Sequence, residues 1–148
     1  MTQKTYQPKI ESLKPAWHLL DAEGISLGRL ATKIVYFLSG KYRRDYAPHL
    51  DNSDYVVVIN CAKIKITGKK LRQKKYFRHS GKLGKLKETK LDLLMRERPE
   101  KAVFLAVKNM LAKNKLQKRR LVRLKLFVGE KHSFEDKFRV NPPAGGKS

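Results

Sequence analysis

The stretch 54–87, DYVVVINCAKIKITGKKLRQKKYFRHSGKLGKLK, places an apolar strand directly before the densest positive charge in the chain. Residues 56–59, VVVI, are β-branched throughout, which is typical of a strand covered on both faces. Cations follow from Lys63 onward, and no acidic residue separates Asp54 from Glu88. Aromatic rings suited to stacking on bases or sugars lie among the cations: Tyr76, Phe77 and His79. The stretch therefore predicts a core strand followed by a surface that binds a polyanion.

The composition favours nucleic acid as the partner. The chain has 148 residues, 41% of them hydrophobic, which suits one folded domain with a hydrophobic core. Its 35 Lys and Arg against 13 Asp and Glu give a net charge of +22, so the folded chain repels itself unless a partner supplies negative charge. No apolar segment approaches the roughly 20 residues of a membrane-spanning helix. We expect a nucleic-acid partner, no membrane and no homo-oligomer.

The N-terminal segment does not have the pattern of a targeting sequence. It contains neither the apolar core of a secretory signal nor the Arg and Ser enrichment of an organelle presequence. We therefore expect a cytoplasmic protein, with an organelle as the alternative. Pro8 and Pro15, without any periodicity, predict an extended arm over residues 1–15.

Apolar patterns in the first part of the chain predict a strand and a helix. Residues 17–22, WHLLDA, predict a strand that ends at a Glu-Gly turn. Ser26 is placed to cap a helix that ends at Gly40. The helix has an apolar face at helical spacing: Leu27, Leu30, Ala31, Ile34 and Leu38. Arg29 and Lys33 lie on the opposite face, for which solvent and RNA contact remain open alternatives.

The middle of the chain predicts further short strands. A loop fixed by Pro48 spans 41–52, the core strand follows at 54–60, and the alternation in 62–67 predicts a short edge segment. Residues 76–80 predict another short strand within the basic stretch.

Helix signals follow the basic stretch. Thr89 and Asp92 have capping-box spacing before a short helix through Leu91, Leu94 and Met95. Pro99 is suited to the first position of the last predicted helix. This helix has its own apolar face: Val103, Phe104, Val107, Met110 and Leu111.

A second acid-free basic segment, interrupted by leucines, follows and leads into a final strand near 124–128. In this basic arm, 113–123, we expect leucines to pack on the domain: Leu116, Leu121 and, just beyond it, Leu124. We expect its cations to point outward: Lys115, Lys118, Arg119, Arg120 and Arg123. Residues 134–148, rich in Pro and Gly near their end, predict a tail.

Catalytic and metal-binding signals are weak. The segment 21–31, DAEGISLGRLA, carries Gly24 and Gly28 but lacks the G-x-G-x-x-G spacing of a dinucleotide site, so tight helix–strand packing explains its glycines better. Cys61 is the only cysteine and ends the apolar strand, which favours buried packing. The histidines lack the pairing of a helical metal site, and the basic stretches have no carboxylates for magnesium. We expect no cofactor, no metal and no small-molecule substrate.

Several blocks occur in order between residues 17 and 132: WHLLDAEGISLGRLA (17–31), GKYRRDYAPHLDNSDYVVVIN (40–60), ITGKKLRQKKYFRHSG (66–81), RPEKAV (98–103), AVKNMLAKNKLQKRRL (106–121) and RLKLFVGEKH (123–132). Together they resemble the universal large-subunit ribosomal protein thirteen family in its bacterial and organellar form. One block departs from the family pattern, because NMLA at 109–112 replaces a Gly-Met-Leu-Pro turn. We expect this change to let the preceding helix run on.

The resemblance implies an α/β fold: a three-layer α/β/α sandwich with a small, mostly parallel four-stranded sheet, plus basic loops and extended termini. It implies a non-catalytic protein that binds large-subunit rRNA, joins early in subunit assembly and contacts neighbouring large-subunit proteins. A bacterial ribosome in the cytoplasm is the first expectation, and a mitochondrial or plastid ribosome is the alternative. The family's RNA-facing positions correspond here to Lys41, the basic loop Lys69–Lys75, His79 with Gly81, and the arm Lys113–Arg123.

The charge pattern and the resemblance together give one set of candidate rRNA-binding residues. They are Arg29, Lys41, Arg43, Arg44, Lys69, Lys70, Arg72, Lys74, Lys75, Arg78, His79, Gly81, Lys82, Lys85, Lys113, Lys115, Lys118, Arg119, Arg120 and Arg123. We expect them on a single domain over 16–132, which includes a basic loop at 63–87, between the arm at 1–15 and a tail at 133–148.

Two other functions remain to be compared with this one. A free-standing RNA- or nucleotide-binding enzyme on a Rossmann-like fold would show a saturable small-molecule site. A DNA-compacting protein would show a groove-entering motif, and none is recognisable in the sequence.

Overall fold

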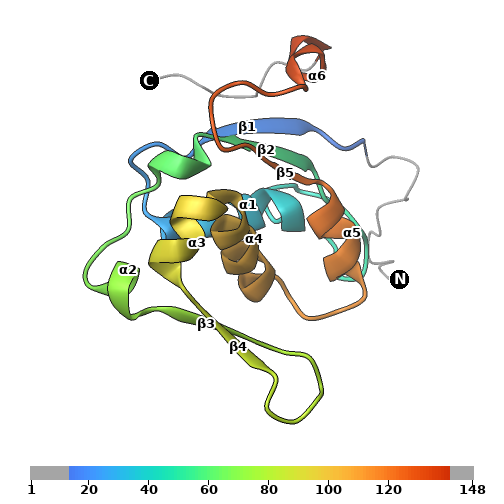
Figure 1. The fold of residues 1–148 in the computed structure, drawn as a ribbon. Helices are drawn as coiled ribbons and strands as arrows, with labels where there is room; N and C mark the ends of the chain where they lie inside the picture. The colour runs from blue at the N-terminus through green and yellow to red at the C-terminus, as the bar shows by residue number, and fades with distance from the viewer. Residues whose placement is uncertain (1–13, 141–148) are drawn as a thin grey trace.

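The computed structural model describes residues 14–140 and is built around a small parallel sheet (Figure 1). Its strands lie in the spatial order β1 (Trp17–Asp21), β2 (Tyr55–Ile59), β5 (Leu124–Leu126). Both outer strands run parallel to β2, in a register that pairs Trp17 with Tyr55 and Val56 with Leu124. Because β2 lies in the middle, residues 56–58 are fully buried, which confirms the predicted core strand.

The longer helices gather on one side of the sheet (Figure 1). They are α1 (Leu27–Ser39) and α4 (Pro99–Met110), with the shorter α3 (Leu91–Glu97) and α5 (Leu116–Val122) beside them. The predicted apolar face of α1 is buried against α4 and against Val56 and Val58 of β2. Gly40 ends α1 in the left-handed conformation, as its sequence position predicts. Pro99 begins α4 at its first turn, which confirms that prediction too.

The other face of the sheet is covered by aromatic side chains and a short helix, α6 (Glu135–Val140). Trp17 stacks on Tyr55 with ring centroids 4.3 Å apart, and Phe134 lies 5.3 Å from Trp17. Phe138 of α6 meets Trp17 edge-on at 6.3 Å. The structure thus differs from the expected tail, because Trp17 gives the segment after 133 an apolar surface to pack on.

A two-stranded antiparallel hairpin projects from the body of the domain (Figure 1). It consists of β3 (Lys75–His79) and β4 (Leu86–Lys90) and follows the short helix α2 (Lys70–Gln73). The strand predicted at 76–80 is confirmed by β3, whereas β4 was not predicted. Thr89 lies inside β4, and Lys90 occupies the cap position of α3, so the predicted capping box is wrong.

The parallel sheet has three strands within residues 14–140, one fewer than expected, and the layering of a sandwich is not confirmed. The expected edge segment at 62–67 forms a 3₁₀ turn, Cys61–Lys63, followed by one isolated parallel bridge between Ser26 and Lys65. The reason is the turn at Asn60, whose φ of 58° breaks the extended conformation directly after β2. The established architecture is a mixed α/β domain with a small, largely parallel sheet.

The helix α4 ends at Met110, so the expectation that it runs on through 109–112 is wrong. Leu111 has an extended backbone, with ψ of 145°, and its side chain is buried. Burial of this leucine draws the chain inward and stops the helix without a glycine or proline. The segment 1–13 of the expected N-terminal arm and the segment 141–148 of the expected tail lie outside the described residues.

Candidate nucleic-acid interface

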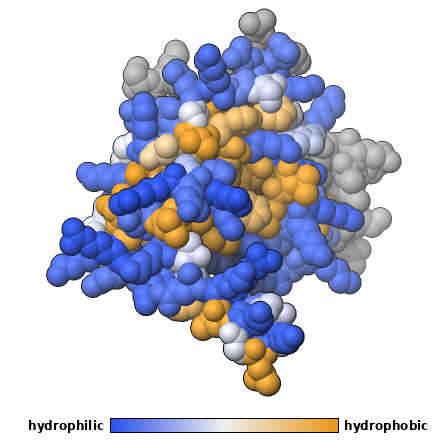
Figure 2. All heavy atoms as spheres, viewed as in Figure 1, coloured by the Kyte–Doolittle hydropathy of each residue, from blue (hydrophilic) through white to orange (hydrophobic). Residues whose placement is uncertain are grey.

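Most of the candidate rRNA-binding side chains lie on the surface. Figure 2 shows hydrophilic side chains over most of the face viewed, with apolar side chains in its middle and at the end of the hairpin. The exposed candidates are Arg29, Lys41, Arg44, Lys69, Lys70, Arg72, Lys74, Lys75, Arg78, His79, Gly81, Lys82, Lys85, Lys113, Lys115, Lys118 and Arg119. The structure brings many of them together on α2 and the hairpin, and others on α5 and the turn before it.

The helix α2 and the hairpin form a basic lobe, residues 69–90. Apart from Lys75, which pairs with Glu88 at 2.8 Å, no cation of the lobe lies in an ion pair within the described part of the chain. Phe77 is 62% exposed and lies on the same face of β3 as His79. Both rings are therefore accessible for stacking.

Tyr76 points to the opposite face of β3 and is half-buried against Leu91 and Leu94 of α3. Burial raises the pKa of its hydroxyl. Tyr76 thus packs the hairpin against α3. Of the three rings predicted to lie among the cations, only Phe77 and His79 are exposed.

The second basic surface, on α5, is fixed to the domain. Leu121 packs against the main core, Leu124 is buried and Leu116 is half-buried, which confirms the predicted packing of the leucines. The Gln117 side chain donates hydrogen bonds to the carbonyl oxygens of Lys108 and Leu111, at 2.9 and 3.3 Å. These bonds tie α5 to the end of α4, a contact that the sequence pattern did not indicate.

Arg43, Arg120 and Arg123 differ from the other candidates. Arg120 is 4% exposed, and the other two are half-buried. The expectation that Arg120 and Arg123 point outward is therefore wrong. Arg123 pairs with Asp51 at 3.1 Å, donates to the carbonyl oxygen of Ser53 and lies over the Tyr55 ring.

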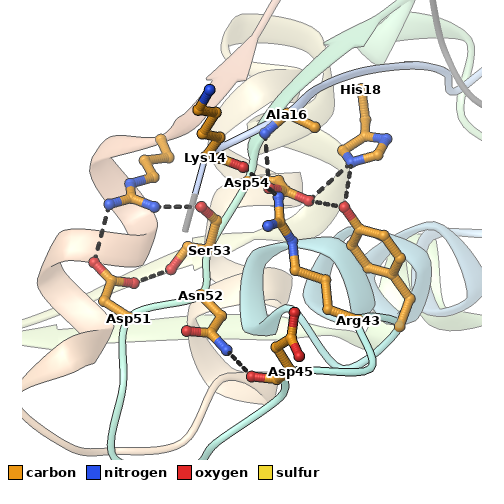
Figure 3. A network of polar contacts seen from close by, with 11 residues as sticks. Lys14, Ala16, His18, Arg43, Asp45, Asp51, Asn52, Ser53 and Asp54 are labelled. Atoms are coloured by element: carbon orange, nitrogen blue, oxygen red, sulfur yellow. Dashed lines mark hydrogen bonds and ion pairs between the residues drawn. The ribbon is translucent and has the colours of Figure 1, made fainter. Parts of the chain in front are cut away.

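Asp54 is the centre of the polar network that holds Arg43 (Figure 3). Its side chain is fully buried and accepts hydrogen bonds from Tyr42, Arg43, the His18 ring and the backbone N–H of Ala16. Burial alone would raise the pKa of Asp54, but the hydrogen bonds and the Arg43 charge outweigh it, so the pKa is lowered. The carboxylate stays ionised and joins the loop 41–52 to β1 and β2.

This network was not predicted from the sequence. The available signal was the pair of carboxylates at Asp51 and Asp54, placed directly before the core strand in a chain with few acids. An acid at the start of a buried strand requires a cation or several donors, and the preceding loop supplies both.

The loop also approaches the end of α1 closely. A Cβ at Gly40 would overlap the backbone carbonyl of Asn52, so this position requires glycine for space as well as for its φ of +68°. The Asn52 amide donates to the carbonyl oxygen of Asp45 at 2.6 Å and closes the loop on itself.

The residues considered for catalysis and metal binding form no such site among the described residues. Cys61 is buried, and burial raises the pKa of its thiol to about 11, so it is an unreactive core residue. Residues 14–140 contain no group of His, Cys, Asp or Glu side chains placed to hold a metal ion. No helix in the same range is long and apolar enough to cross a membrane. A Cβ at Gly24 or at Gly28 would meet no atom within 4 Å. The expectation that tight helix–strand packing explains these two glycines is therefore wrong.

Comparison with known proteins decides the family. The family model described as Ribosomal protein L13 matches residues 15–133. The chain belongs to the ribosomal protein L13 family. Members of the L13 family are structural, non-enzymatic components of ribosomes, so the alternative of a free-standing enzyme is wrong.

Bacterial L13 proteins are among the similar proteins. The large ribosomal subunit protein uL13 of Nitratidesulfovibrio vulgaris is 48% identical over 129 residues, which cover 87% of this chain and 90% of that protein. The uL13 protein of Lawsonia intracellularis shows the same identity and coverage. That of Syntrophus aciditrophicus is 47% identical over 132 residues, covering 89% of this chain and 93% of the relative.

Proposed function

We propose that this protein is a structural constituent of the large ribosomal subunit and binds its rRNA without catalysing a reaction. Membership of the L13 family and relatives named large ribosomal subunit protein uL13 support this role. The observation that carries the binding mode is the distribution of charge. Of the exposed candidate cations, only Lys75 lies in an ion pair within residues 14–140, so the others are free to contact phosphates.

We assign the rRNA contacts to the basic lobe and to α5, with Lys41 and Arg44 at the end of α1. Lysines and arginines there face solvent, so a phosphate backbone can replace the water around them. Arg43, Arg120 and Arg123 act instead as scaffold residues, because internal contacts or burial withdraw them from the surface. Phe77 and His79 provide the stacking faces.

The domain over 16–132 is proposed as the rRNA-binding unit, flanked by 1–15 and 133–148. Its partners are large-subunit rRNA and neighbouring large-subunit proteins, and it joins the subunit early in assembly. The bacterial relatives favour a ribosome in the bacterial cytoplasm over a mitochondrial or plastid one.

Two measurements test the role. Mass spectrometry of large subunits purified from the source cells at moderate salt should find the protein at one copy per subunit. Binding of the purified protein to large-subunit rRNA should weaken steeply as salt rises, because each phosphate contact releases counterions. Absence from the subunits, or an rRNA affinity that does not depend on salt, would refute the proposal.

A further inference from the structure

A cleft of about 830 Å³ lies between the start of α1, the segment 65–67, α2 and the end of α4. Part of its lining is apolar: Leu27, Ile66, Leu91, Ala106 and Met110. Cations from three different segments also line it: Arg29, Lys65, Lys70 and Lys74. No carboxylate occurs among the described residues that line this α1–α4 cleft. Its volume lies in the range of small-ligand sites, and its charge suits an anion.

Polar side chains in the cleft are suited to a base edge. Thr32, Gln73 and Asn109 also line the cleft. The two amides each offer a donor and an acceptor, which is what the Watson–Crick edge of an unpaired base requires.

The presence of glycine at position 28 indicates that the cleft holds a ligand. It is the second residue of α1, has no positive φ, and a Cβ built on it would meet no atom within 4 Å. Neither the backbone nor internal packing therefore requires glycine at this helical position, where glycine is a poor helix former. A larger side chain at Gly28 would extend into the cleft that Gly28 lines. Glycine keeps this space open.

A second hollow, of about 530 Å³, continues the cationic surface. It shares Ser26, Arg29, Lys65 and Thr67 with the cleft and adds Lys33. A chain of phosphates that enters the cleft can therefore pass over Arg29 and Lys65 and continue towards Lys33. Two adjoining cationic hollows suit a polynucleotide better than a lone nucleotide.

We propose that the α1–α4 cleft holds one unpaired nucleotide of large-subunit rRNA. Its base lies against the apolar side chains of the lining, and the adjoining phosphates lie among Arg29, Lys65, Lys70 and Lys74. This inference rests on the proposed function and adds to it a site for one splayed-out base. Single-stranded rRNA is favoured over a peptide because the cleft is cationic and a polynucleotide brings a charge at every residue.

The test compares two Gly→Leu variants in the full chain. Gly28→Leu places a side chain in the cleft, and Gly129→Leu is the matched control, because a Cβ at Gly129 also meets no atom within 4 Å and Gly129 does not line the cleft. Stacking of one base is worth a factor of roughly 5 to 150 in affinity, so Gly28→Leu should lose that much rRNA affinity. Its salt dependence should stay as in the wild type, because no cation is removed.

Each outcome decides the proposal. If the wild type binds rRNA and the two variants bind it with equal affinity, the proposal about the cleft is overturned but the rRNA-binding function stands. If the wild type does not bind rRNA, both are overturned. If Gly28→Leu does not fold, ultraviolet cross-linking of the wild-type complex takes its place: a nucleotide attached to a peptide containing Ile66 or Met110 supports the site, and its absence overturns it. Tight binding of free adenosine monophosphate that rRNA does not displace would show a small-molecule site instead.

Discussion

Neutralising four exposed cations of α2 and its flanks should make rRNA binding less sensitive to salt without changing the fold. The variant replaces Lys69, Lys70, Arg72 and Lys74 by Gln. All four are exposed, and none lies in an ion pair within the described residues. Each phosphate contact contributes about 0.7 to 0.9 to the slope of log affinity against log salt, so the four together should reduce it by about 2.8 to 3.6.

The change in slope gives a measurable ratio. Between about 50 and 200 mM salt the wild type should lose roughly 50- to 150-fold more affinity than the variant. Filter binding or fluorescence anisotropy with large-subunit rRNA fragments over a salt series measures it, and circular dichroism checks the fold.

The matched control removes the same charge elsewhere. Lys101, Lys108, Lys131 and Lys137 are also exposed and lie outside the proposed surface, so their replacement by Gln should leave the slope close to that of the wild type. If both quadruple variants reduce the slope equally, the net charge of +22 and not the basic lobe drives binding, and the assignment of contacts is refuted.

The scaffold gives three further predictions. Asp54→Asn should lower the free energy of unfolding by about 3 kcal/mol, because it leaves the half-buried Arg43 without its counter-charge, and Asp51→Asn, nearer the surface, should cost clearly less; urea denaturation of both variants compares them. Folding lowers the pKa of Asp54, so the carboxylate stabilises the fold above about pH 4, and this stabilisation is lost as the pH falls further. Thermal melts from pH 7 to pH 2 should show the loss in the wild type and much less of it in Asp54→Asn. Parallel curves for the two proteins would contradict this. Gly40→Ala should destabilise by roughly 1–3 kcal/mol through strain at positive φ and overlap with the loop, whereas Gly129→Ala should be nearly neutral, and equal melting temperatures would show that the loop yields instead.

Patterns that reflect burial were predictable from the sequence. The β-branched run of β2 and the helical spacing of α1 depend on removal of apolar side chains from water, which periodicity records directly. The strand β4 was missed because LKETK has no apolar alternation, and its position follows from pairing with β3 across the turn. The helix α6 was missed because its packing surface, Trp17, comes from the opposite end of the chain.

The exposure of cations was predicted correctly on α2 but not where internal ion pairs hold the side chain. A lysine on α2 is exposed whatever the rest of the fold does, because its charge needs hydration. Whether Arg43 and Arg123 are exposed depends on their ion-pair partners, which the loop 41–52 brings to them where it lies beside β2. The sequence did contain their partners, Asp51 and Asp54, but nothing in it specified which cations they would bind.

The three candidates withdrawn from the surface, Arg43, Arg120 and Arg123, are all arginines. Arginine presents a planar fork that can satisfy a carboxylate and a carbonyl together, and Arg123 does so with Asp51 and Ser53. Lysine is a compact, well-hydrated charge, and lysines predominate on the exposed basic lobe. With the loop and α5 already held by Arg43, Arg123 and Gln117, the cations next to them are positioned before rRNA arrives. Binding then orders fewer side chains, and more of the electrostatic attraction remains as affinity.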